Sequence, residues 1–171
     1  MAFDAFFKLD GFPGESKDEK HSEWIEIISY SGGVDQPASA SASSVGSLSS
    51  ERANFRQMVI TKPIDKASPK LAQACAAGDH IGSGIIELCR AGGDKQPYME
   101  YKLTDVMISS FSCGGANIAD GGAGGGKDVP VETLSLSYGK IEWKYTQTQV
   151  AGGKGSGNVA CGWDLKTNKK V

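Results

Sequence analysis

Residues 131–148 read VETLSLSYGKIEWKYTQT and carry the clearest structural pattern in the chain. Apolar and polar residues alternate through Val131–Tyr138 and again through Ile141–Thr148. Because successive side chains of a strand point to opposite faces, each run predicts a strand with one buried face. We expect Gly139-Lys140 to join the two strands as a short hairpin connection.

Similar runs occur elsewhere and predict a mainly β fold. Eight short strands separated by turn signals are typical of a sandwich or a barrel. The six further runs are Phe3–Leu9, Trp24–Tyr30, Asn54–Thr61, Gly84–Arg90, Tyr98–Leu103 and Val106–Cys113.

One segment predicts a helix, from Ser68 as its N-cap to Gly78 as its C-terminal stop. Pro69 suits the first helical position. Leu71, Ala74 and Cys75 recur at i, i+3 and i+4, which gives one apolar stripe. Since so short a helix is marginal in water by itself, we expect it to pack on the sheet.

Length and charge exclude several classes of protein. The chain has 171 residues, which suits a single domain spanning 1–171. Eighteen Lys and Arg against 20 Asp and Glu give a formal charge of −2, whereas proteins that neutralise nucleic-acid phosphates carry a basic surplus. No run approaches the ~20 apolar residues of a membrane helix. Residues 1–9 lack the basic leader of a secretory signal.

Three segments do not predict regular secondary structure. Residues 32–50 hold seven serines and residues 114–127 hold seven glycines, and the tail from 151 is again glycine-rich. Long loops of this kind are usually functional or disordered. Since ordering them costs conformational entropy, we expect a partner to order the first loop, with permanent disorder as the alternative.

Candidate catalytic and metal motifs are weak. Residues 121–127 match the GxxxxGK of a phosphate-binding loop, but Asp128 replaces the Ser or Thr and a strand follows in place of a helix. Ser16 and His21 have no nucleophile elbow near them, so they are interpreted as part of a solvated loop. His80 suits the C-terminal end of the predicted helix.

The four cysteines show no CxxC spacing and are predicted to be idle or core thiols of a cytosolic protein. Together with the weak motifs, they lead us to expect no catalytic residue, no cofactor and no metal site. The cysteines are Cys75, Cys89, Cys113 and Cys161.

Several blocks resemble the haemolysin-coregulated protein (Hcp) family of bacterial type VI secretion. The resemblance runs from end to end and is interrupted mainly by the serine-rich and glycine-rich loops. The matching blocks are Phe3–Leu9 with Gly14-Glu15-Ser16, Asp18 and His21; Lys62–Leu71 through Ala74, Gly78 and His80; Tyr101–Val106 with Ser109-Ser110; Pro130–Glu132 through Leu136–Tyr138 to Trp143–Tyr145; and Gly162–Leu165.

The resemblance implies a two-sheet β-barrel with one short flanking helix, similar to phage tail-tube proteins, that assembles into hexameric rings. In this family, rings stack into the inner tube of the secretion apparatus, contact its spike and sheath, and carry small effector proteins in the lumen. It also implies a protein that starts in the cytoplasm and is secreted without a signal peptide. No enzymatic activity, nucleic-acid binding or membrane insertion is implied. A ring-shaped soluble carrier that builds no tubes is the alternative, and an enzyme with dispersed catalytic residues is a third class.

Assembly makes two groups of residues candidates for contact sites. Edge strands of a small β domain need a partner, and contacts that repeat around a ring can supply one. In the loop 32–50, we expect Val34, Val45 and Leu48 to anchor the contact between stacked rings. Ser29 and Ser31, at the end of a predicted strand, are candidates for lumen-facing contacts with effectors.

Overall fold

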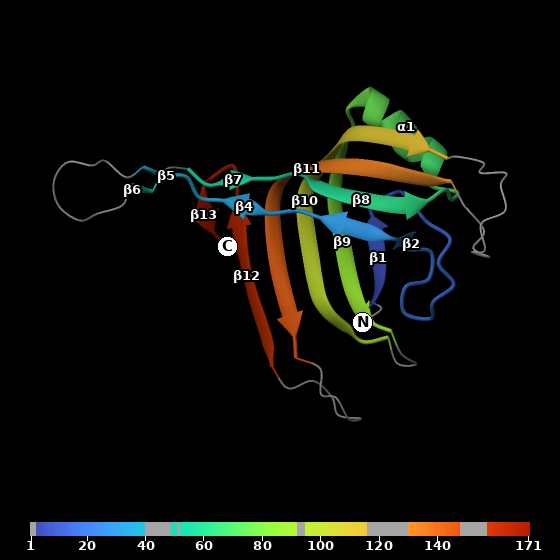
Figure 1. Ribbon diagram of the computed structural model, residues 1–171, viewed down its shortest axis with the longest axis horizontal. Helices are drawn as coiled ribbons and strands as arrows, with labels where there is room; N and C mark the ends of the chain where they lie inside the picture. Colours follow the sequence, from blue (N-terminus) through green and yellow to red (C-terminus); the bar gives the residue numbers. More distant parts are fainter. Residues whose placement is uncertain (1–2, 40–48, 51, 92–94, 116–129, 148–156) are drawn as a thin grey trace, which may run out of the picture.

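The computed structural model describes residues 3–39, 49–50, 52–91, 95–115, 130–147 and 157–171. Within them, nine strands form one sheet and one helix, α1 (Ser68–Ala77), lies beside it (Figure 1). The strands are β1 (Phe3–Leu9), β2 (Ile25–Ile27), β3 (Ser29–Ser31), β8 (Met58–Pro63), β9 (His80–Arg90), β10 (Pro97–Gly114), β11 (Val131–Thr146), β12 (Asn158–Asp164) and β13 (Lys169–Lys170).

The sheet branches at its longest central strands. Its main path runs β13-β12-β11-β10-β9-β1-β2, and β8 pairs with both β11 and β3 away from this path. The first half of β11, 131–136, pairs with β8, and the second half, 140–146, pairs with β12. All pairings among the described strands are antiparallel.

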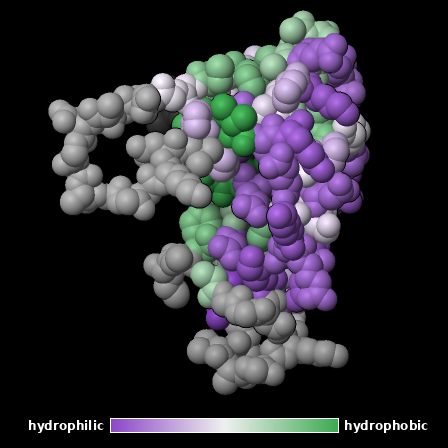
Figure 2. Space-filling view, turned by 90° about the vertical axis from the view of Figure 1, so that its right-hand side faces the viewer, coloured by the Kyte–Doolittle hydropathy of each residue, from purple (hydrophilic) through white to green (hydrophobic). Residues whose placement is uncertain are grey.

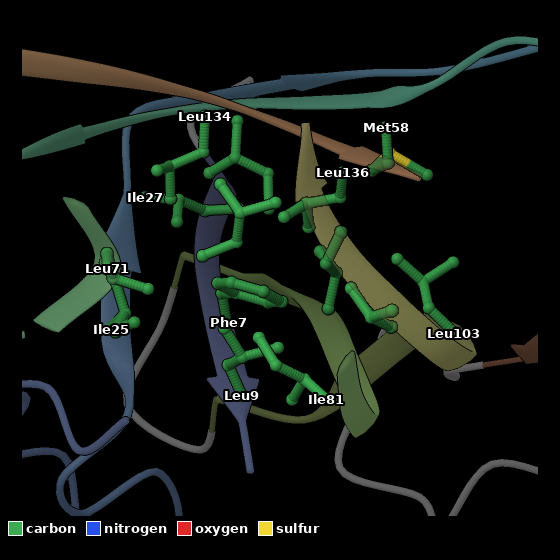
Figure 3. Packing of buried hydrophobic residues seen from close by; sticks show 14 of the residues in the cluster. Phe7, Leu9, Ile25, Ile27, Met58, Leu71, Ile81, Leu103, Leu134 and Leu136 are labelled. Atoms are coloured by element: carbon green, nitrogen blue, oxygen red, sulfur yellow. The ribbon is translucent and has the colours of Figure 1, made fainter. Parts of the chain in front are cut away.

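The core lies between two parts of this bent sheet. Leu134 and Leu136 of β11 point toward Phe7 and Leu9 of β1, and Leu71 of α1 enters from the side (Figure 3). Alternate residues of the first part of β11 are buried, as the period-2 pattern predicted. In β1, Ala5, Phe7 and Leu9 face the core as predicted, and Phe6 between them is buried as well.

The predicted helix is confirmed, although its N-cap is wrong. Pro69 lies in its first turn, and Gly78 ends it with a left-handed φ of 67°. The N-cap position belongs to Ala67, which makes no side-chain cap hydrogen bond. The Ser68 hydroxyl donates instead to the Glu132 carboxylate at 2.7 Å.

The predicted hairpin at Gly139-Lys140 is wrong, because β11 continues through both residues. Gly139 lies where β11 leaves β8 and joins β12. Opposite it, Asp105 of β10 has a left-handed φ of 54°. A Cβ on Gly139 would lie 3.2 Å from an Asp105 carboxylate oxygen, so glycine permits this close approach of the two strands.

Other observed strands begin or end at residues different from those predicted. The runs Tyr98–Leu103 and Val106–Cys113 form one strand, β10. Its pairing with β11 skips Asp105 and shifts register between Ile108 and Ser110. The run Trp24–Tyr30 is divided at Ile28, where the chain leaves β1 and joins β8. His80 begins β9 and contacts Asp105, with 3.1 Å between Nδ1 and Oδ1, so it does not serve as a helix-end partner.

The fold is therefore mainly β with one flanking helix, as predicted. The strands form one branched sheet whose pairing path is open, so the predicted arrangement of two sheets closed into a barrel is not established by the pairings. In the part of the chain that the structure describes, no helix has the length and apolar character needed to cross a membrane.

A buried cation joins α1 to the sheet. Lys62 of β8 is fully buried, and its Nζ lies 2.9 Å from a carboxylate oxygen of Glu132, its direct partner on β11. The same ammonium group donates to Ser68 Oγ at 3.1 Å and lies 2.9 Å from Asp65 Oδ1. Because a buried charge is costly without partners, these contacts fix the start of α1 over β8 and β11.

Replacing Lys62 by Ala should lower the free energy of unfolding by about 3–5 kcal/mol, because Glu132 would stay buried without its cation. Urea denaturation measures this loss. Lys66→Ala is the matched control, since Lys66 pairs with Glu23 on the surface and such pairs contribute about 0–1 kcal/mol. The double variant Lys62→Met/Glu132→Leu should recover much of the loss, and equal losses in Lys62→Ala and Lys66→Ala would contradict this account.

Candidate assembly surfaces

An arm of paired strands extends from the body of the molecule (Figure 1). At its root, β4 (Val34–Asp35) pairs with β7 (Asn54–Phe55). Farther out, β5 (Ala38–Ser39) pairs with β6 (Ser49–Ser50). The described part of the predicted loop 32–50 therefore includes two short ladders, which give the arm a defined direction.

The root of the arm is clamped by Arg56. Its guanidinium group donates two hydrogen bonds to the Asp35 carboxylate, from Nε at 2.8 Å and from Nη2 at 2.9 Å. Hydrogen bonding to Asp35 raises the pKa of Arg56. The Arg56 backbone N–H also donates to the Gly33 carbonyl at 2.9 Å. These bonds join the outgoing and returning strands.

Aromatic side chains hold the same root against the sheet. The Phe55 ring stacks near Trp143 of β11 and Trp163 of β12, with centroids 6.4 Å away in each case. The Tyr138 hydroxyl donates to the Arg56 carbonyl at 2.9 Å. The arm is thus anchored to β11 and β12, which pair with each other from Lys140 onward.

Val34 lies at this root with half of its surface exposed, whereas Val45 and Leu48 lie outside the described residues. Beside Val34 is a cavity of about 290 Å³ lined largely by aromatic and sulfur-containing side chains. Its lining includes Tyr30, Met58, Tyr101 and Trp143.

Ser29 and Ser31 are exposed on β3, on the same face of the strand. They lie directly opposite Thr61 and Val59 of β8. Small side chains continue in register across the next two strands. The two rows are Ser29, Thr61, Thr133 and Ser112, and Ser31, Val59, Ser135 and Ser110. The sheet therefore presents a face of small, mostly hydroxyl-bearing residues away from the core.

The outer edge of β12 is another candidate contact surface. β13 pairs only with Trp163 and Asp164, so the edge of Asn158–Cys161 has no further strand beside it among the described residues. Val159 on this edge is 69% exposed. Apolar residues on an open strand edge are suited to pairing with another chain.

On another side of the molecule, broad hydrophilic areas adjoin a narrower hydrophobic band (Figure 2).

The interpretation of Ser16 and His21 as solvated is wrong, because both are buried. The His21 ring stacks on Phe6, with 4.1 Å between centroids, and lies between two carboxylates. Its Nδ1 is 2.7 Å from Asp18 Oδ1, and its Nε2 is 2.8 Å from Glu87 Oε2.

Cys89 lies beside this histidine, with its Sγ 3.8 Å from His21 Nε2. Burial, together with the charges of Glu87 and Asp18, raises the pKa of the Cys89 thiol to about 11. Burial opposes ionisation of Asp18, but hydrogen bonds from His21 and Lys95 outweigh it and lower its pKa to about 2. Sequence reasoning missed this cluster because Glu87 and Cys89 are more than 60 residues from His21.

Comparisons with known proteins agree with the fold. The family described as "Type VI secretion system effector, Hcp" matches residues 6–145. The protein named "Protein hcp1" of Pseudomonas aeruginosa is 33% identical over 169 residues, which cover 98% of each chain. The "Major exported protein" of the same bacterium is 27% identical over 145 residues, 84% of this chain and 79% of that one.

A solved structure supports the same relationship. "Structure of a type six secretion system protein" superposes with a TM-score of 0.87 and 36% identity, covering 99% of this chain and 100% of that one. Since the sequence match spans most of the chain and the fold is shared, this chain belongs to the Hcp family of type VI secretion system proteins.

Proposed function

We propose that this protein is a structural subunit of the type VI secretion inner tube. Six copies form a ring through contacts between neighbouring sheets, and rings stack into a tube that carries effector proteins in its lumen. Spike and sheath components contact this tube, and the protein is itself exported, as the name of the "Major exported protein" says of that relative. Membership of the Hcp family supports this role.

The observation that carries the proposal is the anchored arm. A ribbon that extends from the body and is held at its root by Arg56 and Phe55 is suited to reaching a neighbouring copy. The open edge of β12 offers a second, independent surface for a neighbour within the ring. Within each subunit, the segment 25–31 pairs with β1 through Ile25–Ile27 and with β8 through Ser29–Ser31.

In the proposed tube, the arm makes the contacts between one ring and the next. Val34 then anchors the arm on the adjacent ring, and Val45 and Leu48 are proposed to continue this contact. An exposed valine at the arm's root can be buried in such a contact without losing a hydrogen bond. A carrier ring that builds no tubes remains the second candidate function, and it requires no contact by the arm.

Val34→Asp should reduce tube formation by about tenfold or more, since each 1.4 kcal/mol lost from an interface is a factor of ten. Deleting Val34–Ser50 should do the same. Both variants should keep the mass of six subunits. Val34→Asp should keep the thermal unfolding temperature, and the deletion should weaken ring stacking far more than it weakens folding of the monomer. Light scattering measures the mass, and negative-stain images count rings and tubes.

Ile64→Asp is the matched control, because Ile64 is 48% exposed and Val34 is 50% exposed. Ile64 follows the end of β8 that is remote from the arm (Figure 1). Normal tubes from Val34→Asp would contradict the assignment of the arm to stacking. Single rings of wild-type protein without tubes would favour the carrier function, and a monomer would contradict both.

The face of small residues around Ser29 and Ser31 is proposed to line the lumen. Short hydroxyl-bearing side chains leave space for cargo and can exchange hydrogen bonds with many protein surfaces. A lumen-facing position in an assembled ring is accessible to small reagents and poorly accessible to bulky ones.

Ser31→Cys should therefore react readily with a small maleimide and slowly with a polymer-linked maleimide when the protein is assembled. The variant is made in a Cys113→Ser/Cys161→Ser background, because both of those thiols are exposed. Ser22→Cys, at another exposed position, should react with both reagents. Peptide mass spectrometry measures the labelling, and equal labelling of Ser31→Cys and Ser22→Cys by the bulky reagent would contradict a lumen-facing site.

A further inference from the structure

The cluster around His21 lies on the face of the sheet opposite the core. Glu87 and Cys89 are two residues apart on β9, so their side chains point to the same face. Phe6 is the direct partner of Glu87 on β1, and its ring covers one side of the His21 imidazole. The segment before β2 carries His21 over this face.

Three different donor atoms converge at this point. His21 Nε2, Glu87 Oε2 and Cys89 Sγ all lie within 4.8 Å of one another. Imidazole nitrogen, carboxylate oxygen and thiolate sulfur are the ligands that zinc uses in proteins. His21 and Cys89 are buried, and the Glu87 side chain is 18% exposed, which leaves one side open to water and to an entering ion.

The hydrogen bonds of His21 favour a cation beside Nε2. Asp18 accepts a hydrogen bond from Nδ1 and fixes this nitrogen as a donor, as a carboxylate does for histidines that bind metals. Nε2 then faces the Glu87 carboxylate, and two electron-rich atoms 2.8 Å apart need a positive species between them. A proton satisfies these two atoms, whereas a metal ion also engages the nearby Cys89 sulfur.

The spacing of the donors suits a tetrahedral ion. Bonds of about 2.0–2.3 Å place neighbouring donors roughly 3.3–3.7 Å apart around zinc. The 3.8 Å between Nε2 and Sγ is close to this range. The 2.8 Å between Nε2 and Oε2 must widen by about half an ångström. Since Glu87 is partly exposed, its carboxylate has room to make this adjustment.

We propose that His21, Glu87 and Cys89 bind one divalent cation of the zinc class, with Asp18 orienting the histidine and water completing the coordination. Binding exchanges the metal ion for two protons, one held between His21 Nε2 and the Glu87 carboxylate and one from the Cys89 thiol, so the charge of the cluster is unchanged. Lys95, whose Nζ lies 3.2 Å from Asp18 Oδ2, stays on the outer side of that carboxylate.

The ion fastens the segment that carries Asp18 and His21 to β9. Hydrogen bonds from the Gly14 and Ser16 backbone N–H groups already join this segment to the Glu23 and Trp24 carbonyls, just before β2. The metal adds a connection to a strand far away in the sequence. Because a ligand that binds only the folded chain stabilises it, the bound ion raises the unfolding temperature.

The test uses tag-free protein that is stripped with a chelator, mixed with Zn²⁺ or Co²⁺ and desalted. We expect one equivalent of zinc per chain by elemental mass spectrometry. Cobalt should give a thiolate charge-transfer band and the intense visible bands of tetrahedral Co²⁺. Cys89→Ser should lose the charge-transfer band and bind at least about tenfold more weakly, and Asp18→Asn should weaken binding by about 10–100-fold.

Cys113→Ser is the matched control, because Cys113 is an exposed thiol outside the cluster. It should keep both the stoichiometry and the cobalt spectrum. Folded wild-type protein that retains well below one equivalent of zinc, cobalt bound without a thiolate band, or loss of the band in Cys113→Ser would each overturn the proposal. Ring mass measured on the same samples reports on assembly separately, so failure of one proposal is distinguishable from failure of the other.

Discussion

The fully buried ammonium group of Lys62 fixes how β8 and the start of α1 lie against β11. Lys62 on β8 is neutralised by Glu132 on β11 and by Asp65 just before α1. Because none of these strands can shift register without separating the charges, the ion pairs specify one alignment of β8 on β11. The contacts of Lys62 with Asp65 and Ser68 also hold the start of α1 against β8.

The same branch point explains why the arm has a fixed base. β11 is shared by β8 and β12, and aromatic residues from β11 and β12 pack against Phe55 at the arm's root. A surface that holds its direction before it contacts another copy avoids the loss of affinity that ordering on contact would cause. The hydrogen bonds between Arg56 and Asp35 help to fix the direction of the arm on its solvent-exposed side.

Sequence patterns predicted the core strands and the helix because burial there repeats with the period of the backbone. Phe7, Leu71 and Leu134 occupy the faces that their spacing indicated. The partner change at Gly139 was not predictable, because glycine between two alternating runs has the same signature in a turn and in a bent strand. His21 was missed for a different reason. Its partners Glu87 and Cys89 are supplied by a distant strand, and the pairing of β1 with both β2 and β9 brings them together.

The length of β11 has a mechanical consequence. Its 16 residues span roughly 50 Å of nearly continuous strand, bonded to β10 on one side and to β8 and then β12 on the other. A pull along this strand loads those ladders in shear, so many hydrogen bonds must break together. A pull across it would peel them one by one, which makes the domain far stiffer along one axis than across it.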